Sequence, residues 1–218
     1  MRMWQTIRTS SLGRHSHDEA FAAIVLAGGY EEAGDLGRFQ VKVGDVVLHD
    51  RFEAHLDRFS ASGAVMLNLR LGHLDGFTPG LATIADPDAI VRAAEKDQVE
   101  AVGLLLAAAT GRRTLPADWP DELATALIGN PSLVLSDWAH RRGIAPWTVS
   151  RGFARVFGVT PEGFRARVRT RRAWRSIRTS QTPLAWIAAE QGFADQPHMT
   201  RSVKQLTGMV PQMWRRCK

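Results

Sequence analysis

Residues 188–215, AAEQGFADQPHMTRSVKQLTGMVPQMWR, contain the pattern that decides the fold of the C-terminal part of this chain. The small residue Ala188 is followed four residues later by Gly192, which can end one helix in a left-handed conformation and begin a tight turn. The next helix then carries its apolar side chains, Met199, Val203 and Leu206, on one face. The stretch therefore predicts two short helices that cross at a steep angle.

The same pattern occurs in residues 139–165, AHRRGIAPWTVSRGFARVFGVTPEGFR. The Ala and Gly repeat at an offset of 49 residues, and the later positions at an offset of 50. The shared positions are Ala139, Gly143, Ser150-Arg151, Gly158, Pro161 and Phe164-Arg165 in the first copy and Ala188, Gly192, Thr200-Arg201, Gly208, Pro211 and Trp214-Arg215 in the second. One Ala-x-x-x-Gly occurs in helical hairpins of every kind. Two copies, each with an arginine-bearing helix and a Gly-x-x-Pro exit, predict two helix-turn-helix units.

A long helix is predicted between the two units. Thr160 suits an N-cap, Pro161 suits the first helical position, and the helix should run to about Arg178. Such a helix can hold both second helices toward one face of DNA, where successive major-groove segments lie about 34 Å apart. The side chains predicted to face outward for DNA contact are Trp147, Ser150, Arg151 and Arg155 in the first copy and Gln196, Thr200, Arg201 and Lys204 in the second.

The distribution of charge also favours nucleic acid. The chain has 218 residues and a formal net charge of +6. Residues 129–218 hold 16 Lys or Arg against 4 Asp or Glu, a balance of +12, whereas residues 1–128 have a balance of −6. Arginine-rich faces can merely keep helices in solution, but a surplus confined to one half is typical of a domain that meets a polyanion.

These residues resemble the C-terminal domain of the arabinose-regulator (AraC/XylS) family of bacterial transcription factors, over about Ser132–Arg216. The resemblance implies a monomer with two helix-turn-helix motifs joined by a long helix. It carries base-reading roles onto Trp147, Ser150 and Arg151 in the first unit and onto Gln196, Pro197, Thr200 and Arg201 in the second. The sequence departs from the family at Met199 and Val203, where Phe is usual, and at Thr170 and Ser176, where Leu is usual. Pro197 also stands where a hydrogen-bonding side chain often reads a base.

The N-terminal half predicts a different fold. Short apolar or alternating runs at 21–27, 39–43, 45–49 and 64–71, separated by Gly28-Gly29, Gly37, Gly44 and Ser62-Gly63 as turns, indicate a small β-barrel or sandwich. From Asp86 onward the apolar spacing is helical, and residues 84–128 should form a connector, a dimerisation surface, both, or ordinary core. The predicted fold is α+β, with a barrel at 1–83, a helical connector at 84–128 and an all-α DNA-binding domain at 129–218.

Histidines mark a candidate pocket in the barrel. His15-Ser-His17, the segment Gly44–His49 and His55 resemble the two motifs of a cupin barrel, which many regulators of this family carry as an effector sensor. In metal-binding cupins an HxH pair, a Glu and a distant His gather around one ion, so the resemblance implies a divalent transition metal at His15, His17 and His55. The expected Glu would fall near Ala22 and is missing. The three histidines can instead line a pocket for a small organic effector, or be ordinary polar strand residues.

The sequence thus predicts a sequence-specific transcription regulator that is not an enzyme. Its expected partners are double-stranded DNA, a small-molecule effector, RNA polymerase if it is an activator, and a second copy of itself if residues 84–128 form a dimerisation surface. An apolar run long enough for a membrane span and a signal peptide are both missing, which predicts a cytoplasmic, nucleoid-associated protein. The alternative is a metal-dependent cupin enzyme with an accessory DNA-binding domain. A DNA-repair alkyltransferase would need a cysteine cluster, and the sequence has only Cys217.

Overall fold

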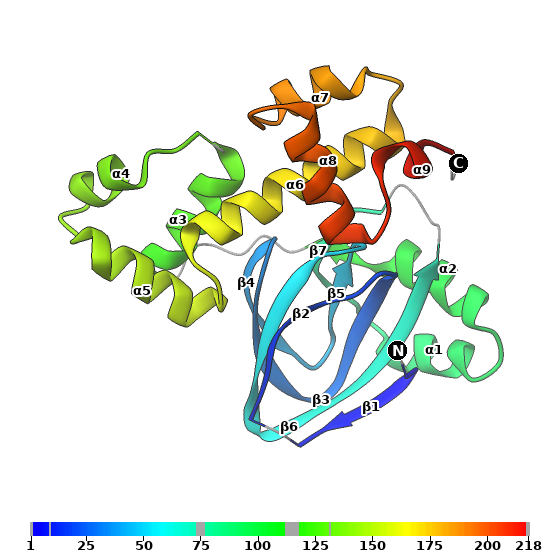
Figure 1. Cartoon of the computed structure of the whole chain (residues 1–218). Helices are drawn as coiled ribbons and strands as arrows, with labels where there is room; N and C mark the ends of the chain where they lie inside the picture. Colours follow the sequence, from blue (N-terminus) through cyan, green and yellow to red (C-terminus); the bar gives the residue numbers. More distant parts are fainter. Residues whose placement is uncertain (1, 9, 73–76, 112–117, 131, 217–218) are drawn as a thin grey trace. The chain divides into compact units, whose positions relative to one another are not determined.

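The computed structural model of the chain describes residues 2–8, 10–72, 77–111, 118–130 and 132–216. Cys217 lies outside these residues. The chain forms two compact units, Met1–Pro116 and Ala117–Lys218 (Figure 1). Within the described residues, no helix has the length and apolar character needed to span a membrane.

The first unit is built on one antiparallel sheet of eight strands. The strands are β1 (Trp4–Ile7), β2 (Ser11–Ser16), β3 (Ala20–Gly34), β4 (Gly37–Lys42), β5 (Asp45–His49), β6 (Ala54–Gly72), β7 (Gly80–Thr83) and β8 (Thr110–Gly111). Their order is β1-β6-β3-β5-β7-β8, and β2 pairs with β6 while β4 pairs with β3. The predicted antiparallel β domain followed by helices is confirmed.

The two long strands, β3 and β6, pair with each other over most of their length and bend where two glycines meet. The pairing register shifts between Val25 and Ala27 and again between Gly28 and Tyr30. A Cβ on Gly28 would lie 2.0 Å from the carbonyl oxygen of Gly63, so only glycine permits this backbone approach. The prediction that Gly28-Gly29 and Ser62-Gly63 are turns is therefore wrong: both are irregularities inside continuous strands.

The bend gives the sheet two halves with one shared inner face. The N-terminal half of β3 pairs with β5 and the C-terminal half pairs with β4. Side chains from both halves, among them Val25, Tyr30, Phe39 and Met66, form one buried apolar cluster. The predicted small barrel is thus a sheet folded on itself (Figure 1), and the hydrogen-bonded path through its described strands stays open.

Two helices, α1 (Pro87–Ala94) and α2 (Gln98–Ala108), pack on the other face of this sheet. Ile90 and Leu105 from the helices join Ile24 and Leu67 from the strands in a second core. The carboxylates of Asp86 and Asp97 accept hydrogen bonds from Ala89 N–H (3.0 Å) and Val99 N–H (2.7 Å), and so cap the two helices separately.

The predicted connector, residues 84–128, is divided between the two units. Its first half, with α1 and α2, belongs to the sheet because their apolar faces complete that core. Its second half, α3 (Trp119–Gly129), belongs to the helical unit, where Leu123 and Leu127 are fully buried.

The second unit contains α3 and six further helices among its described residues. These are α4 (Leu135–Arg141), α5 (Pro146–Phe157), α6 (Pro161–Thr179), α7 (Leu184–Glu190), α8 (Gln196–Thr207) and α9 (Pro211–Arg216). The long central helix α6 packs against α3, α5, α7, α8 and α9. It begins where the sequence predicts, because the Thr160 hydroxyl accepts a hydrogen bond from Gly163 N–H (3.2 Å).

Candidate nucleic-acid interface and buried pocket

A cavity of about 320 Å³ lies on the inner face of the folded sheet. Its aromatic and apolar lining includes Phe21, Tyr30 and Met66. Its histidines and carboxylates come from four different strands or their ends: His15, His17, Glu32, His49, His55 and Asp57. The strand register explains this gathering, since His15 pairs with His55 and Glu32 pairs with Asp57.

The three histidines predicted from the sequence lie together in this cavity. The Nε2 atoms of His15 and His55 are 3.1 Å apart, and the rings of His15 and His17 are centred 5.1 Å from each other. Burial, together with the neighbouring imidazoles of His15 and His49, lowers the pKa of His17 to about 4. Burial also holds the pKa of His55 well below its usual value. A role for these histidines in effector or metal binding stays a prediction.

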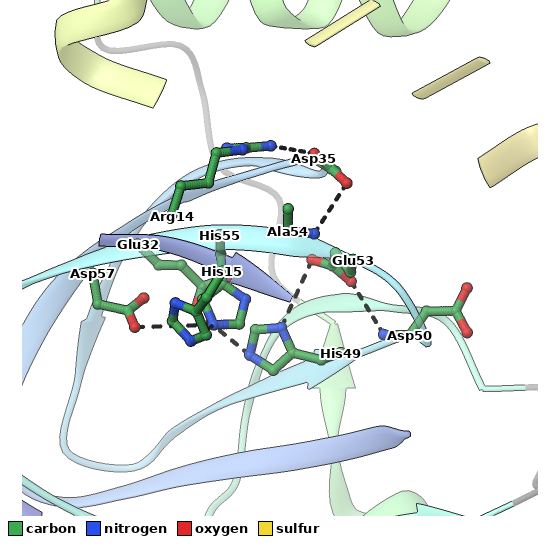
Figure 2. A network of polar contacts seen from close by, with 10 residues as sticks. All are labelled: Arg14, His15, Glu32, Asp35, His49, Asp50, Glu53, Ala54, His55 and Asp57. Carbon is green, nitrogen blue, oxygen red and sulfur yellow. Dashed lines mark hydrogen bonds and ion pairs between the residues drawn. The ribbon is translucent and has the colours of Figure 1, made fainter. Parts of the chain in front are cut away.

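The structure adds acidic partners that the sequence did not reveal. Glu32, His49, Glu53, His55 and Asp57 form what we call the acid–histidine cluster (Figure 2), and all five are buried. His49 Nε2 lies 3.6 Å from Glu32 Oε2, His49 Nδ1 lies 3.7 Å from Glu53 Oε1, and His55 Nε2 lies 3.9 Å from Asp57 Oδ2. These separations exceed ordinary hydrogen bonds. Strand register, which pairs Glu32 with Asp57, helps to bring the members together.

Burial and neighbouring charges shift the pKa values of three members of the cluster. It raises the pKa of Glu32 to about 8, despite the opposing charge of His49. Burial alone would lower the pKa of His49, but the carboxylates of Glu32 and Glu53 outweigh it and raise that pKa to about 9. Burial also raises the pKa of Asp57 to about 6. Perturbed groups of this kind, gathered in a cavity, are typical of binding sites.

The cluster was missed for an identifiable reason. With Gly28-Gly29 interpreted as a turn, residues after it were not counted on the inner face of the same strand. Because β3 continues to Gly34, Tyr30 and Glu32 both reach the cavity. A carboxylate thus reaches the cavity from the same strand as Ala22, ten residues later along the chain, at Glu32. His49 was recognised as part of a motif but not as a pocket residue.

In the second unit the two predicted turns are built alike. Gly143 and Gly192 have φ of +63° and +73°. Their N–H groups donate to the carbonyls of His140 and Ala189, both at 3.0 Å. The following N–H groups, of Ile144 and Phe193, donate to the carbonyls of Ala139 (3.0 Å) and Ala188 (2.9 Å). Each turn is therefore a glycine-terminated helix end that satisfies the last carbonyls of the first helix.

The second helix of each unit, α5 or α8, buries one face. Val149, Phe153 and Phe157 are buried on α5, while Val156, predicted to share that stripe, is only half-buried. On α8, Met199 and Val203 are fully buried and Leu206 is half-buried. The two residues that depart from the Phe of the AraC family therefore still fill the core.

The opposite faces carry the side chains predicted for DNA contact. Trp147 is 66% exposed, and Arg151 and Arg155 are exposed, while Ser150 is half-buried. On α8 the exposed members are Pro197, Arg201 and Lys204, and Gln196 and Thr200 are half-buried. The Arg151 guanidinium lies 5.9 Å from the centre of the Trp147 ring. Six of the nine predicted side chains are thus exposed and three are half-buried, and their contacts with bases stay a prediction.

A family model described as "Helix-turn-helix domain" matches residues 138–217. This part of the chain is a helix-turn-helix domain. In such domains the second helix of each motif enters the major groove of DNA. The chain therefore carries the DNA-binding domain of a transcription regulator.

Several solved structures are similar at low identity. The C-terminal domain of AraT from Geobacillus stearothermophilus is 19% identical to this chain, with a TM-score of 0.42. The match covers 45% of this chain and 84% of the AraT chain. The DNA-binding domain of AdpA in complex with a target DNA is 19% identical, with a TM-score of 0.43. That match covers 46% of this chain and 93% of the AdpA chain. ToxT from Vibrio cholerae, bound to an unsaturated fatty acid, is 12% identical, with a TM-score of 0.45. That match covers 98% of this chain and 92% of the ToxT chain. A search of curated proteins finds no match.

Three arginines of α6 stabilise neighbouring helix ends and turns in the helix-turn-helix domain. Arg165 donates to the carbonyl of Leu133 (2.8 Å), Arg169 donates to that of Gly192 (3.0 Å), and Arg172 donates to that of Ile128. The Arg169 guanidinium also lies 4.5 Å from the centre of the Phe193 ring. Part of the positive surplus that suggested nucleic acid thus holds helix ends and turns in place.

Proposed function

We propose that the protein is a sequence-specific transcription regulator whose helices α5 and α8 read successive major-groove segments, under the control of a small effector in the pocket of the sheet. The observation that carries the proposal is the repeated unit. Two turns with the same hydrogen bonds each present a second helix with an exposed arginine at the same position, Arg151 or Arg201.

The length of α6 supports simultaneous reading by both helices. Its 19 residues span about 28 Å at about 1.5 Å per residue. Successive major-groove segments on one face lie about 34 Å apart. Because α4 and α5 lie toward the start of α6 and α7 lies toward its end (Figure 1), one helix can place both units on the same face of a duplex.

Selection of bound DNA from random sequence by the full chain tests this proposal. We expect an enriched site with two protected major-groove patches about 10 base pairs apart. The double variant Arg151→Ala/Arg201→Ala should lose the enrichment, while Arg92→Ala, which removes an exposed arginine from α1, should keep it. Enrichment without sequence preference, or a single protected patch, would contradict the reading of successive grooves.

An organic effector fits the dimensions of the cavity. Small-molecule pockets measure about 300–1,000 Å³ and combine apolar walls with a few polar groups. The cavity of about 320 Å³ has this composition. An effector can act only by binding the DNA-competent arrangement with a different affinity from the incompetent one.

A pocket-filling substitution tests the sensor. Ala23 lines the cavity, so Ala23→Leu should abolish the response of a reporter gene to growth conditions while the protein still binds DNA. Ala107→Leu, at an exposed position of α2, serves as the matched control. A response identical in the wild type and Ala23→Leu would exclude the cavity as the sensor.

Further partners belong to the same proposal. The helix α2 exposes Val99 (80%) and Leu104 (43%), which favours pairing with a second copy of the chain through this helix. An activator would also contact RNA polymerase, and a DNA-bound regulator would work in the nucleoid of the cytoplasm.

We propose no catalytic activity. The acid–histidine cluster favours one second candidate, the metal-dependent cupin enzyme with an accessory DNA-binding domain.

A further inference from the structure

We infer that the acid–histidine cluster binds one divalent transition-metal ion, with Glu32, His49 and His55 as ligands and His15 completing the set from the neighbouring strand. The ion would lie in the pocket proposed for the effector, although binding it requires neither DNA nor the effector. This ligand set differs from the three histidines that the sequence suggested, because it is centred on the buried side of His55.

The spacing of the donor atoms supports a shared ion. One ligand atom from each of Glu32, His49 and His55 lies within 4.8 Å of the other two. A tetrahedral ion with bonds of about 2.0–2.1 Å separates its ligand atoms by about 3.3 Å. The observed separations, 3.1 Å between His15 and His55 and 3.6 Å between His49 and Glu32, bracket that value. The second is too long for a good hydrogen bond.

Buried polar atoms in the cluster lack partners among the described residues. Glu32 Oε1 and Asp57 Oδ1 are shielded from solvent and accept no hydrogen bond from a described residue. Glu32 is 1% exposed and Asp57 is 6% exposed, so bulk water does not satisfy these oxygens. Leaving such atoms unpaired costs free energy, which an ion bound among them would recover.

The charge of the cluster points to a cation. Three carboxylates, those of Glu32, Glu53 and Asp57, are buried together with the two imidazoles of the cluster. The nearby Arg14 does not offset them, since its guanidinium forms an ion pair with Asp35 (Figure 2). Buried carboxylates need protons or a counter-charge, and a divalent ion supplies two positive charges.

The orientation of His15 fits a ligand. Its Nδ1 lies 2.8 Å from the carbonyl oxygen of Gly13, which can only accept, so Nδ1 carries the proton. The Nε2 lone pair of His15 then faces His55 Nε2. Metal-binding histidines are commonly fixed in this way, with the second nitrogen donating to a backbone carbonyl. Imidazole and carboxylate together suit Zn²⁺, Mn²⁺, Fe²⁺, Co²⁺ or Ni²⁺.

The test uses the full chain, stripped with a chelator and titrated with Zn²⁺ or with Co²⁺ alone. We expect one ion per chain by elemental analysis, a tetrahedral absorption band with Co²⁺, and a melting temperature that rises with metal concentration. Glu32→Gln and His49→Gln should each raise the dissociation constant at least about 10-fold. His140→Gln, at an exposed position of α4, is the matched control and should bind like the wild type.

The outcomes separate the alternatives. If stripped wild-type protein binds no ion, the inference is overturned and His49 serves as a buried ion-pair partner. If Glu32→Gln and His49→Gln bind normally but His17→Ala does not, the ion belongs to the three-histidine set instead. Circular dichroism identifies a variant that fails to fold, and the other variant then decides. Specific DNA binding by the stripped protein, measured in parallel, shows whether the proposed regulator survives a failure of the metal site.

Discussion

The two helix-turn-helix units have turns of the same geometry but differ in the side-chain packing next to those turns. Two backbone hydrogen bonds at the turn of Gly143 repeat at the turn of Gly192 with nearly equal lengths. The packing next to the turns does not repeat. Phe157 and Phe164 meet as aromatic rings 5.5 Å apart, whereas the matching pair, Thr207 and Trp214, is joined by a hydrogen bond from Trp214 Nε1 to Thr207 Oγ1 (2.8 Å). The turn thus fixes the geometry of the unit, whereas different kinds of side-chain contact can fill its core.

A second difference lies beneath the second helices. Gly152 on α5 faces the ring of Trp119, and a Cβ there would lie 2.5 Å from Trp119 Cζ2. The matching position on α8 is Ser202. The first unit is therefore supported by α3, which also holds Arg142 through Glu122. We expect the first unit to depend more on its neighbours than the second.

The largest expected difference concerns the two cores. Phe153→Ala should lower the free energy of unfolding by about 3–5 kcal/mol, because it empties a fully buried aromatic site. The matching Val203→Ala removes two methyl groups and should cost about 2 kcal/mol. Urea unfolding followed by circular dichroism measures both. Equal losses would show that the two cores contribute alike to stability.

The next effect concerns recognition itself. Arg151→Ala and Arg201→Ala should each weaken binding to the selected site by about 1–3 kcal/mol and relax base preference at separate positions. Fluorescence anisotropy with single-base variants of the site measures this, with Arg92→Ala as the charge control. Equal losses on selected and random DNA would make these arginines phosphate contacts rather than base readers.

The sequence was sufficient for the helical unit and insufficient for the pocket, for physical reasons. The turns depend on short-range features, a small residue and a glycine four positions apart, so the units and the cap at Thr160 could be predicted. The acid–histidine cluster depends on long-range strand register, which brings Glu32 opposite Asp57. That register depends on glycines at 28 and 63, which look like turns in a sequence and become bends only when the two strands pair.

A smaller effect tests the dependence of the first unit on α3. Gly152→Ala should cost about 1 kcal/mol, since overpacking against Trp119 outweighs the gain in helix propensity. In a Trp119→Ala background the same substitution should instead stabilise by about 1 kcal/mol. Ser202→Ala on α8 should stabilise by about 0.5 kcal/mol in either background. A Gly152→Ala effect that is unchanged by Trp119→Ala would show that the indole does not limit this position.

The smallest effect concerns how the two second helices begin. The Asp195 carboxylate accepts a hydrogen bond from His198 N–H (2.6 Å), whereas Ala145, the N-cap residue of α5, supplies no side-chain cap. Asp195→Ala should therefore cost about 1 kcal/mol, and Ala145→Asp should gain about 0.5 kcal/mol by adding the missing cap. On DNA the second substitution should act in the opposite direction, because a carboxylate placed beside Trp147 would meet the phosphates that this helix end approaches. Thermal unfolding and DNA titration of Ala145→Asp separate the two effects. A variant that became more stable and bound DNA as tightly as the wild type would show that the start of α5 stays away from the phosphate backbone.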